Sequence, residues 1–223
     1  MEFPPITIVM TTFFLPGERG VLRRISANRT LRSWGAYLDY QNKVNLHIAD
    51  DGSDFPLASN WLGVTHSVQY RQGVGASLNK GFAKAFETSP LVLYAVDDWA
   101  LTQDFDLTPW VEMLLQREDI GMVRLGPPHP NLTGRVEMLS GNWEGWGLVL
   151  DRQGFAFGTR PALFHKRFID AYGWFAENTS AVEVERIYNE SFCTTPGPNI
   201  VLALPHPWEH IGPESLSDLE PVK

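Results

Sequence analysis

The sequence predicts an α/β fold in which helices cover a mostly parallel central sheet. Short runs of apolar, often β-branched residues alternate with longer segments whose apolar residues recur at helical spacing. Two of the short runs end in paired aspartates, and open α/β sheets bind ligands beyond the carboxyl ends of their strands. The chain has 223 residues, which suits one domain with a sizeable core, and no repeat or linker divides it.

The first half contains six expected elements in the order strand, helix, strand, strand, helix, strand. Apolar runs predict the strands, at residues 6–12, 44–49, 64–70 and 91–96. Helical spacing predicts one helix at 21–38 and a second that opens at residue 73 and ends before Pro90. Parallel strands joined through helices account for this order.

The second half has a weaker pattern. We expect helices and strands there in mixed order, the helices at 110–115, 161–172 and 179–188 and the strands at 121–125 and 147–150. The segment after Pro205 is rich in proline and acidic residues, so we expect it to wrap the surface or to lack order.

Composition excludes several classes of protein. Lys and Arg number 18 and Asp and Glu 26, and the net charge of −8 argues against a nucleic-acid clamp and against electrostatic attachment to anionic membranes. A bound phosphate group would then need a cation, for which a divalent metal is the obvious choice. The single cysteine, Cys193, excludes a disulfide framework and a cysteine-based zinc cluster. No signal peptide and no apolar run of about 18 residues is visible, so we expect a cytoplasmic protein without a membrane span.

Two expected strands are followed directly by paired acids, Asp50-Asp51 and Asp97-Asp98. Two carboxylates at a strand end can hold Mg²⁺ or Mn²⁺ and leave coordination positions open for diphosphate oxygens. Each pair also has a simpler interpretation, because Asp51-Gly52-Ser53 is a turn signal and Asp98 could cap a helix. Their joint occurrence after two strands of the same half favours a site.

A glycine-rich segment opens the second helix. Gly73-Val74-Gly75 is a weak signal by itself, but Arg71 precedes it and Asn79-Lys80-Gly81 follows early in the helix. Because a helix N-terminus and an arginine can both face an anionic group, the segment fits a phosphate-binding role.

Together these motifs resemble the nucleotide-sugar half of the GT-A glycosyltransferases, family 2 in particular. The resemblance covers residues 7–98 and rests on four segments in the family's order, which are Ile8-Val9-Met10-Thr11-Thr12, Ile48-Ala49-Asp50-Asp51-Gly52-Ser53, the run from Gly73 to Gly81, and Leu93-Tyr94-Ala95-Val96-Asp97-Asp98-Trp99. It implies the GT-A fold, with a nucleotide-sugar-binding half at 1–99, an acceptor and catalytic half at 100–212 and a tail at 213–223.

The resemblance also implies which residues bind the nucleotide. Thr11 and Thr12 would lie beside the base, and Asp51 would hydrogen-bond the uracil imide or the ribose. The full nucleotide-binding set is Thr11, Thr12, Asp51, Arg71, Gly75, Asn79 and Asp97.

The Asp97-Asp98 pair stands where the family has its DxD motif. By resemblance, Asp98 would bind the metal that bridges the diphosphate, and Asp97 would contact the ribose or a metal-bound water. The first motif position is Val96, which departs from the family's pattern. Some GT-A enzymes use a C-terminal histidine as a further metal ligand, and His210 is the candidate, since a neutral imidazole suits Mn²⁺. A lone histidine is, however, more often a surface or packed residue.

Residues 157–164 and 171–175 resemble the segment that precedes the family's catalytic carboxylate. An inverting transfer needs one carboxylate to take the proton of the acceptor hydroxyl. Glu183 aligns best with that base, and Glu185 is the alternative. Because the two are two residues apart on an expected helix, they point in different directions. A solvated acidic first turn that complements the helix dipole is the simpler interpretation.

The resulting hypothesis is a metal-dependent, inverting glycosyltransferase. It would move a sugar from a UDP-sugar, or another nucleotide-sugar, to an acceptor hydroxyl with the help of Mn²⁺ or Mg²⁺. The acceptor would be a glycan, a protein or a small molecule, with DNA less favoured because of the net charge. Trp143, Trp146 and Trp174, three of the eight tryptophans, could stack on acceptor sugars, although such rings more often lie in the core.

Two alternatives remain open. One is a nucleotidyltransferase that acts on sugar phosphates, which usually needs a basic glycine-rich loop directly after the first strand. Residues 12–19 read Thr-Phe-Phe-Leu-Pro-Gly-Glu-Arg instead. The other is a non-catalytic carbohydrate-binding protein with the same fold.

Overall fold

A nine-stranded mixed sheet forms the centre of the molecule. The computed structural model describes residues 2–55, 57, 64–126, 136–139, 143, 146–150, 152, 157–204 and 207–212. Over these residues the strands of the large sheet are β1 (Ile6–Thr12), β3 (Val44–Asp50), β4 (Thr65–Val68), β5 (Leu91–Val96), β8 (Ile120–Arg124), β9 (Val136–Met138), β10 (Gly147–Leu150), β11 (Ala162–His165) and β12 (Asn199–Ala203). Their order in the sheet is β4-β3-β1-β5-β11-β8-β12-β10-β9.

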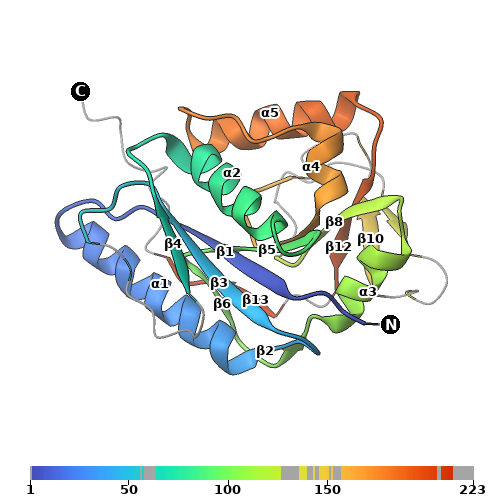
Figure 1. The fold of residues 1–223 in the computed structure, drawn as a ribbon, viewed down its shortest axis with the longest axis horizontal. Helices are drawn as coiled ribbons and strands as arrows, with labels where there is room; N and C mark the ends of the chain where they lie inside the picture. Colours follow the sequence, from blue (N-terminus) through green and yellow to red (C-terminus); the bar gives the residue numbers. More distant parts are fainter. Residues whose placement is uncertain are drawn as a thin grey trace.

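Five helices cover the sheet within the described part of the chain. They are α1 (Glu18–Tyr37), α2 (Gly73–Phe86), α3 (Thr108–Gln116), α4 (Lys166–Tyr172) and α5 (Ala181–Thr194). Helices α1 and α3 lie on one face, and α2, α4 and α5 lie on the other, which gives three layers (Figure 1). The predicted α/β class is therefore confirmed.

The strands of the first half pair in parallel throughout, as predicted. Strand β1 lies between β3 and β5, with Thr12 opposite Asp50 and Thr11 opposite Val96. The residues of β1 are all buried, because helices pack on both faces of this part of the sheet. Both acid pairs thus emerge at the same edge, on either side of the end of β1.

The second half continues the same sheet with mixed pairing. Strand β11 is antiparallel to both β5 and β8, and β12 is parallel to β8. The expected helix at 161–172 was wrong in its first part, where the chain forms β11 before α4 begins at Lys166. Ala162, Leu163 and Phe164 are all buried, because their strand lies between two neighbouring strands. A short run of buried apolar residues has the same sequence pattern in a strand and in a buried helix, so spacing could not distinguish them.

Two small two-stranded sheets complete the fold. One joins β2 (Leu38–Asp39) to β7 (Phe105–Asp106), and the other joins β6 (Trp99–Leu101) to β13 (Trp208–His210). The expectation that the segment after Pro205 wraps the surface or lacks order was wrong for 208–210, which pair with the strand that directly follows Asp98. Residues 213–223, the expected tail, lie outside the described residues.

Two hydrophobic clusters, one on each face of the sheet, contain most of the aromatic side chains. Four of the eight tryptophans are buried on the α1 and α3 face, namely Trp34, Trp99, Trp110 and Trp208. The rings of Trp34 and Trp208 are 4.4 Å apart, so the C-terminal strand β13 is anchored directly on α1. Half of the tryptophans therefore have a packing role.

Candidate active site

An open cleft of about 370 Å³ lies where the carboxyl ends of β1, β3 and β5 meet. Its walls come from these strand ends, from α1, from the N-terminus of α2 and from the segment before α5. Among the lining residues are Thr11, Thr12, Arg23, Asp51, Tyr94 and Thr159. The predicted position of the site, beyond the strand ends, is thus occupied by a cavity large enough for part of a nucleotide.

Asp97 is fully buried in an ion pair with Arg23 of α1. Nε of the arginine donates to Oδ2 at 2.7 Å and Nη2 donates to Oδ1 at 2.9 Å, so the contact is bidentate. Burial alone would lower the pKa of Arg23, but the charge and hydrogen bonds of Asp97 raise that pKa above its ordinary value. Both carboxylate oxygens are therefore taken by the arginine. Contact of Asp97 with a ribose or a metal-bound water stays a prediction.

Asp98, in contrast, meets His210. Nε2 of the histidine lies 3.2 Å from Oδ2 of the aspartate, and the main-chain N–H of Ile211 donates to the carbonyl of Asp98 at 2.8 Å. The hydrogen bond with Asp98 raises the pKa of His210, although partial burial opposes this. The structure thus brings together the two residues that the sequence proposed as metal ligands.

The Asp98–His210 pair fits a divalent metal. Oδ1 of Asp98 is buried and makes no hydrogen bond within the described residues. A Cβ added to Gly212 would lie 2.7 Å from Oδ2 of Asp98 and 3.1 Å from Nε2 of His210, so the glycine leaves the space between them open. One carboxylate and one imidazole form a ligand combination that Mn²⁺ accepts. No cluster of three or more ligating side chains occurs in the described parts of the chain, so further ligands would come from water or a bound phosphate.

Asp51 holds the N-terminus of α2. Its carboxylate accepts the main-chain N–H of Gln72 at 2.8 Å and of Gly73 at 2.9 Å, and it also accepts the side-chain amide of Gln69. The anionic group that this helix N-terminus meets is therefore Asp51 itself. Asp50 has a different role, because it accepts three hydrogen bonds from its own turn and one from Thr12 Oγ1. Only Asp51 of this pair lines the cleft.

Arg71 lies in a neighbouring, more open cavity of about 460 Å³. Its guanidinium carbon is 6.0 Å from the centre of the Phe13 ring, and its backbone has a φ of 43°. Asn178, the other described non-glycine residue with a positive φ, lines the same cavity and donates its N–H to the carbonyl of Gln72. Backbone strain of this kind clusters at ligand sites, and Asp51, Gly73 and Thr179 line both cavities, so this cavity extends the cleft.

Gly75 and Asn79 are not among the lining residues of either cavity, and their role in nucleotide binding stays a prediction. Both residues hold the loop before α5 against α2. A Cβ on Gly75 would lie 1.9 Å from the carbonyl oxygen of Ala176. Asn79 donates to the carbonyl of Phe175 and accepts its N–H, both at 2.9 Å. They shape the cleft indirectly, because they position the loop whose residues Thr179 and Ser180 line the cleft.

The two candidate bases point in different directions, as the spacing predicts. Glu183 lies in the first turn of α5, its side chain 40% exposed, and pairs with Arg186 at 2.6 and 2.9 Å. These hydrogen bonds lower the pKa of Glu183, which makes it a weaker base. Glu185 instead faces inward, and its Oε1 accepts from both the N–H and the hydroxyl of Thr159 at 2.6 Å. Because Thr159 lines the cleft, the structure favours the alternative, Glu185, over Glu183.

Cationic groups lie around Glu185. Burial, together with the nearby charge of Arg160, lowers the pKa of Arg124 to about 10, whereas the charge of Glu185 opposes this. The guanidinium carbon of Arg160 lies 5.5 Å from the Trp99 ring, and the imidazole of His210 lies 5.3 Å from the same ring. Trp99 thus lies between the Glu185 region and the Asp98–His210 pair.

None of the three tryptophans proposed for acceptor binding lines the cleft. Trp146 is 40% exposed and contacts Trp110 edge-on at 5.8 Å, and Trp143 packs against the core cluster. Trp174 is 51% exposed in the loop after α4. Their role in acceptor binding therefore stays a prediction.

Sequence reasoning missed Arg23 and Thr159. The signal for Arg23 was available, because it lies three residues after Gly20 and four before Ala27, both on the buried face of α1. A charged residue at such a position needs a partner, and Asp97 is that partner. No comparable signal marks Thr159, which reaches the cleft only through the pairing of β11 next to β5.

Comparison with known proteins identifies the fold. No family model matches the chain, and no curated protein matches it in sequence. Solved structures do match. Residues 1–349 of S. aureus TarS align with a TM-score of 0.56 and 11% identity, over 89% of this chain and 60% of that one. GalNAc-T7 with UDP, GalNAc and Mn²⁺ aligns with a TM-score of 0.59 and 11% identity, over 93% and 44% of the two chains.

The mannosyltransferase PcManGT from Pyrobaculum calidifontis, with GDP-Man and Mn²⁺, aligns with a TM-score of 0.53 and 13% identity, over 92% of this chain and 58% of that one. This chain therefore has the GT-A fold, as the sequence predicted. It spans between 44% and 60% of the length of these three structures. Among the described residues, no helix has the length and apolar character that a membrane crossing requires.

Proposed function

We propose that this chain is an inverting glycosyltransferase that moves a sugar from a nucleotide-sugar, in the first place a UDP-sugar, to an acceptor hydroxyl. The observation that carries the proposal is the arrangement, at one edge of the sheet, of a cleft large enough for part of a nucleotide, the Asp98–His210 pair and an inward-facing Glu185. The ligands of similar structures, which include UDP, UDP-GlcNAc, GDP-Man and Mn²⁺, support this choice of donor and metal.

In this proposal the donor lies along the cleft with its base toward Asp51 and its diphosphate toward Arg23. Asp51 is rigid, because three hydrogen bonds from the chain hold its carboxylate. Arg23 uses Nε and Nη2 for Asp97, which leaves Nη1 as the donor for a phosphate oxygen. Asp98 and His210 would hold Mn²⁺ or Mg²⁺, which would stabilise the negative charge of the leaving diphosphate.

Glu185 is the proposed general base. Its carboxylate takes the proton of the acceptor hydroxyl as that oxygen attacks the anomeric carbon. The bond between the anomeric carbon and the phosphate oxygen breaks, and the nucleoside diphosphate leaves with the electron pair. The two hydrogen bonds from Thr159 fix the orientation of Glu185, while Arg23 offsets the charge that develops on the leaving group.

A donor screen tests the proposal. UDP-glucose, UDP-GlcNAc, UDP-galactose and GDP-mannose are incubated with the protein, with and without Mn²⁺, and release of the free nucleotide is measured. We expect metal-stimulated hydrolysis of at least one donor, with loss of turnover but retained nucleotide binding in Glu185→Gln. Absence of any UDP or GDP binding in the presence of Mn²⁺ at millimolar ligand would contradict the proposal. Pyrophosphate release from a nucleoside triphosphate and a sugar phosphate would instead indicate a nucleotidyltransferase, and donor binding without turnover would indicate a binding protein.

A further inference from the structure

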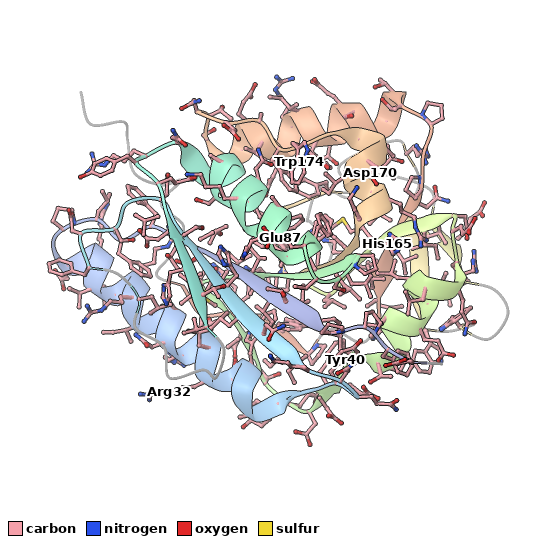
Figure 2. The ribbon with its side chains drawn as sticks, in the orientation of Figure 1. Arg32, Tyr40, Glu87, His165, Asp170 and Trp174 are labelled. Atoms are coloured by element: carbon pink, nitrogen blue, oxygen red, sulfur yellow. The ribbon has the colours of Figure 1, made fainter. Side chains whose placement is uncertain are left out.

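The outer face of α1 exposes aliphatic side chains next to arginines. Val21, Leu22 and Ile25 of this helix are 47%, 43% and 50% exposed, although all three side chains are aliphatic. Arg29 and Arg32 follow at four and seven residues beyond Ile25, which continues the same helix face. Arg32 points away from the sheet at the outer side of the helix (Figure 2).

The N-terminal part of the helix packs on the sheet with small side chains, whereas Leu31 and Trp34 are buried further along it. Up to Thr30 the buried residues are Gly20, Ser26, Ala27 and Thr30, so the large apolar residues of this part remain outside. Leu15, which precedes the helix, is 43% exposed. Its carbonyl oxygen lies against Gly20, because a Cβ added to that glycine would be only 1.7 Å from the oxygen. Leu15 therefore extends the aliphatic surface. A surface helix normally presents polar residues on this side, so the exposed aliphatic group needs an explanation.

Charge on this helix is opposite to that of the rest of the chain. Helix α1 contains five arginines and one acid, whereas the remaining residues contain 13 basic and 25 acidic side chains. Arg19, Arg24, Arg29 and Arg32 are exposed, and none forms an ion pair with another described residue. The net charge of −8 therefore conceals one basic surface. The net charge of the whole chain, which argues against attachment to anionic membranes, does not describe this surface.

We propose that this outer face, formed by Leu15, Val21, Leu22, Ile25, Arg29 and Arg32, docks on the surface of an anionic lipid bilayer. The aliphatic side chains enter the boundary between headgroups and acyl chains, and the arginines contact lipid phosphates. A nucleic acid would use the arginines but gives the three aliphatic side chains no partner. The acidic remainder of the surface is repelled by the same bilayer, which fixes the orientation of the protein.

Docking in this way brings the cleft close to the bilayer. Arg23 projects from the same helix to the inner side, where it lines the cleft. The docking proposal does not rest on the transfer reaction, because it uses only side chains outside the cleft. Vesicle binding and nucleotide turnover can therefore fail independently.

Vesicle co-sedimentation tests the proposal. Full-length protein is mixed with vesicles of phosphatidylcholine alone or of phosphatidylcholine with phosphatidylglycerol. We expect binding only to the anionic vesicles, weakened by salt. Because each arginine near an anionic surface contributes about fivefold in affinity, Arg29→Gln/Arg32→Gln is expected to bind about twenty-five-fold more weakly. Val21→Gln/Leu22→Gln/Ile25→Gln is expected to lose binding at moderate salt although its charge is unchanged.

Matched variants elsewhere control for charge and apolarity. Lys80→Gln/Lys84→Gln/Lys166→Gln removes three exposed cations from α2 and α4, and Val182→Gln removes a residue that is 70% exposed on α5. Both controls are expected to bind like the unmodified chain, and circular dichroism checks that every variant is folded. Equal loss in the lysine variant, full binding by the aliphatic variant, or no vesicle binding at all would each overturn the proposal. So would binding of duplex DNA in place of vesicles, which would identify a nucleic-acid surface.

Discussion

Nε2 of His210 lies 3.2 Å from Oδ2 of Asp98, although 112 positions separate the two residues in the chain. Strand β13 places the histidine there, because it pairs antiparallel with β6 and sets His210 opposite Trp99. The buried ring of Trp208 fixes that strand against Trp34. The candidate metal site therefore depends on docking of a short C-terminal strand as much as on the acidic pair.

Gly212→Ala is expected to weaken metal binding without unfolding the protein. The added methyl group would lie 2.7 Å from Oδ2 of Asp98, so one of the two ligands must move. We expect at least a tenfold loss in Mn²⁺ affinity, measured by titration calorimetry in the presence of UDP. His210→Gln and Asp98→Asn serve as reference variants that remove a ligand outright. Unchanged Mn²⁺ affinity in all three would show that the pair does not hold the metal.

Arg23→Gln is expected to lower both stability and nucleotide affinity, because it leaves the buried carboxylate of Asp97 without its partner. Breaking a buried ion pair lowers the free energy of unfolding by at least about 3 kcal/mol. We expect a loss near that lower limit, because the guanidinium of Arg23 is partly exposed. Urea unfolding measures this loss. The double variant Arg23→Gln/Asp97→Asn removes both charges and is expected to recover most of the stability.

The double variant also separates packing from ligand binding. If Arg23 contacts the diphosphate, UDP affinity stays low in Arg23→Gln/Asp97→Asn even when stability returns. Arg24→Gln, on the exposed side of the same helix, is the matched control and is expected to bind UDP normally. Recovery of UDP affinity together with stability would restrict Arg23 to a structural role.

Much of the first half of the fold could be predicted from the sequence, because each of its elements has a local cause. The β-branched runs, Pro16-Gly17 and Pro90 define four strands and two helices within a few residues of their observed bounds. The position of both acid pairs at one sheet edge follows from parallel pairing alone. The two-residue spacing of Glu183 and Glu185 likewise predicted that only one of them could face the acceptor.

The rest of the site depends on contacts between distant segments, for which no local pattern exists. Choosing Glu185 over Glu183 required the position of Thr159, which lies just before β11, the strand that pairs with β5 and β8. Gly75 and Asn79 match a binding motif, and only the fold shows that they also hold the loop before α5. Such assignments need the fold and cannot be read from spacing.

Glu185→Gln is expected to reduce turnover of the nucleotide-sugar by about a hundredfold or more, since a positioned base contributes that much. The amide can still accept from Thr159, so nucleotide affinity and stability should stay near those of the unmodified protein. Glu183→Gln removes an exposed pair with Arg186 and is expected to change turnover less than twofold. Initial rates of nucleotide release measure both variants, and a larger loss in Glu183→Gln would reverse the assignment.

His165 is expected to make the protein less stable in acid. Its Nδ1 accepts the N–H of Arg167 at the start of α4, and burial, together with the charge of Arg167, lowers the pKa of the imidazole to about 4. In the unfolded chain that pKa is about 6.5, so between these values the unfolded state binds more protons. The stability from neutral His165 is therefore complete above about pH 6.5 and is lost as the pH falls toward 4. His165→Asn keeps the cap and should flatten this dependence in urea unfolding, whereas His66→Asn, at an exposed histidine, should not. An equally steep pH dependence in His165→Asn would assign the acid sensitivity to other groups.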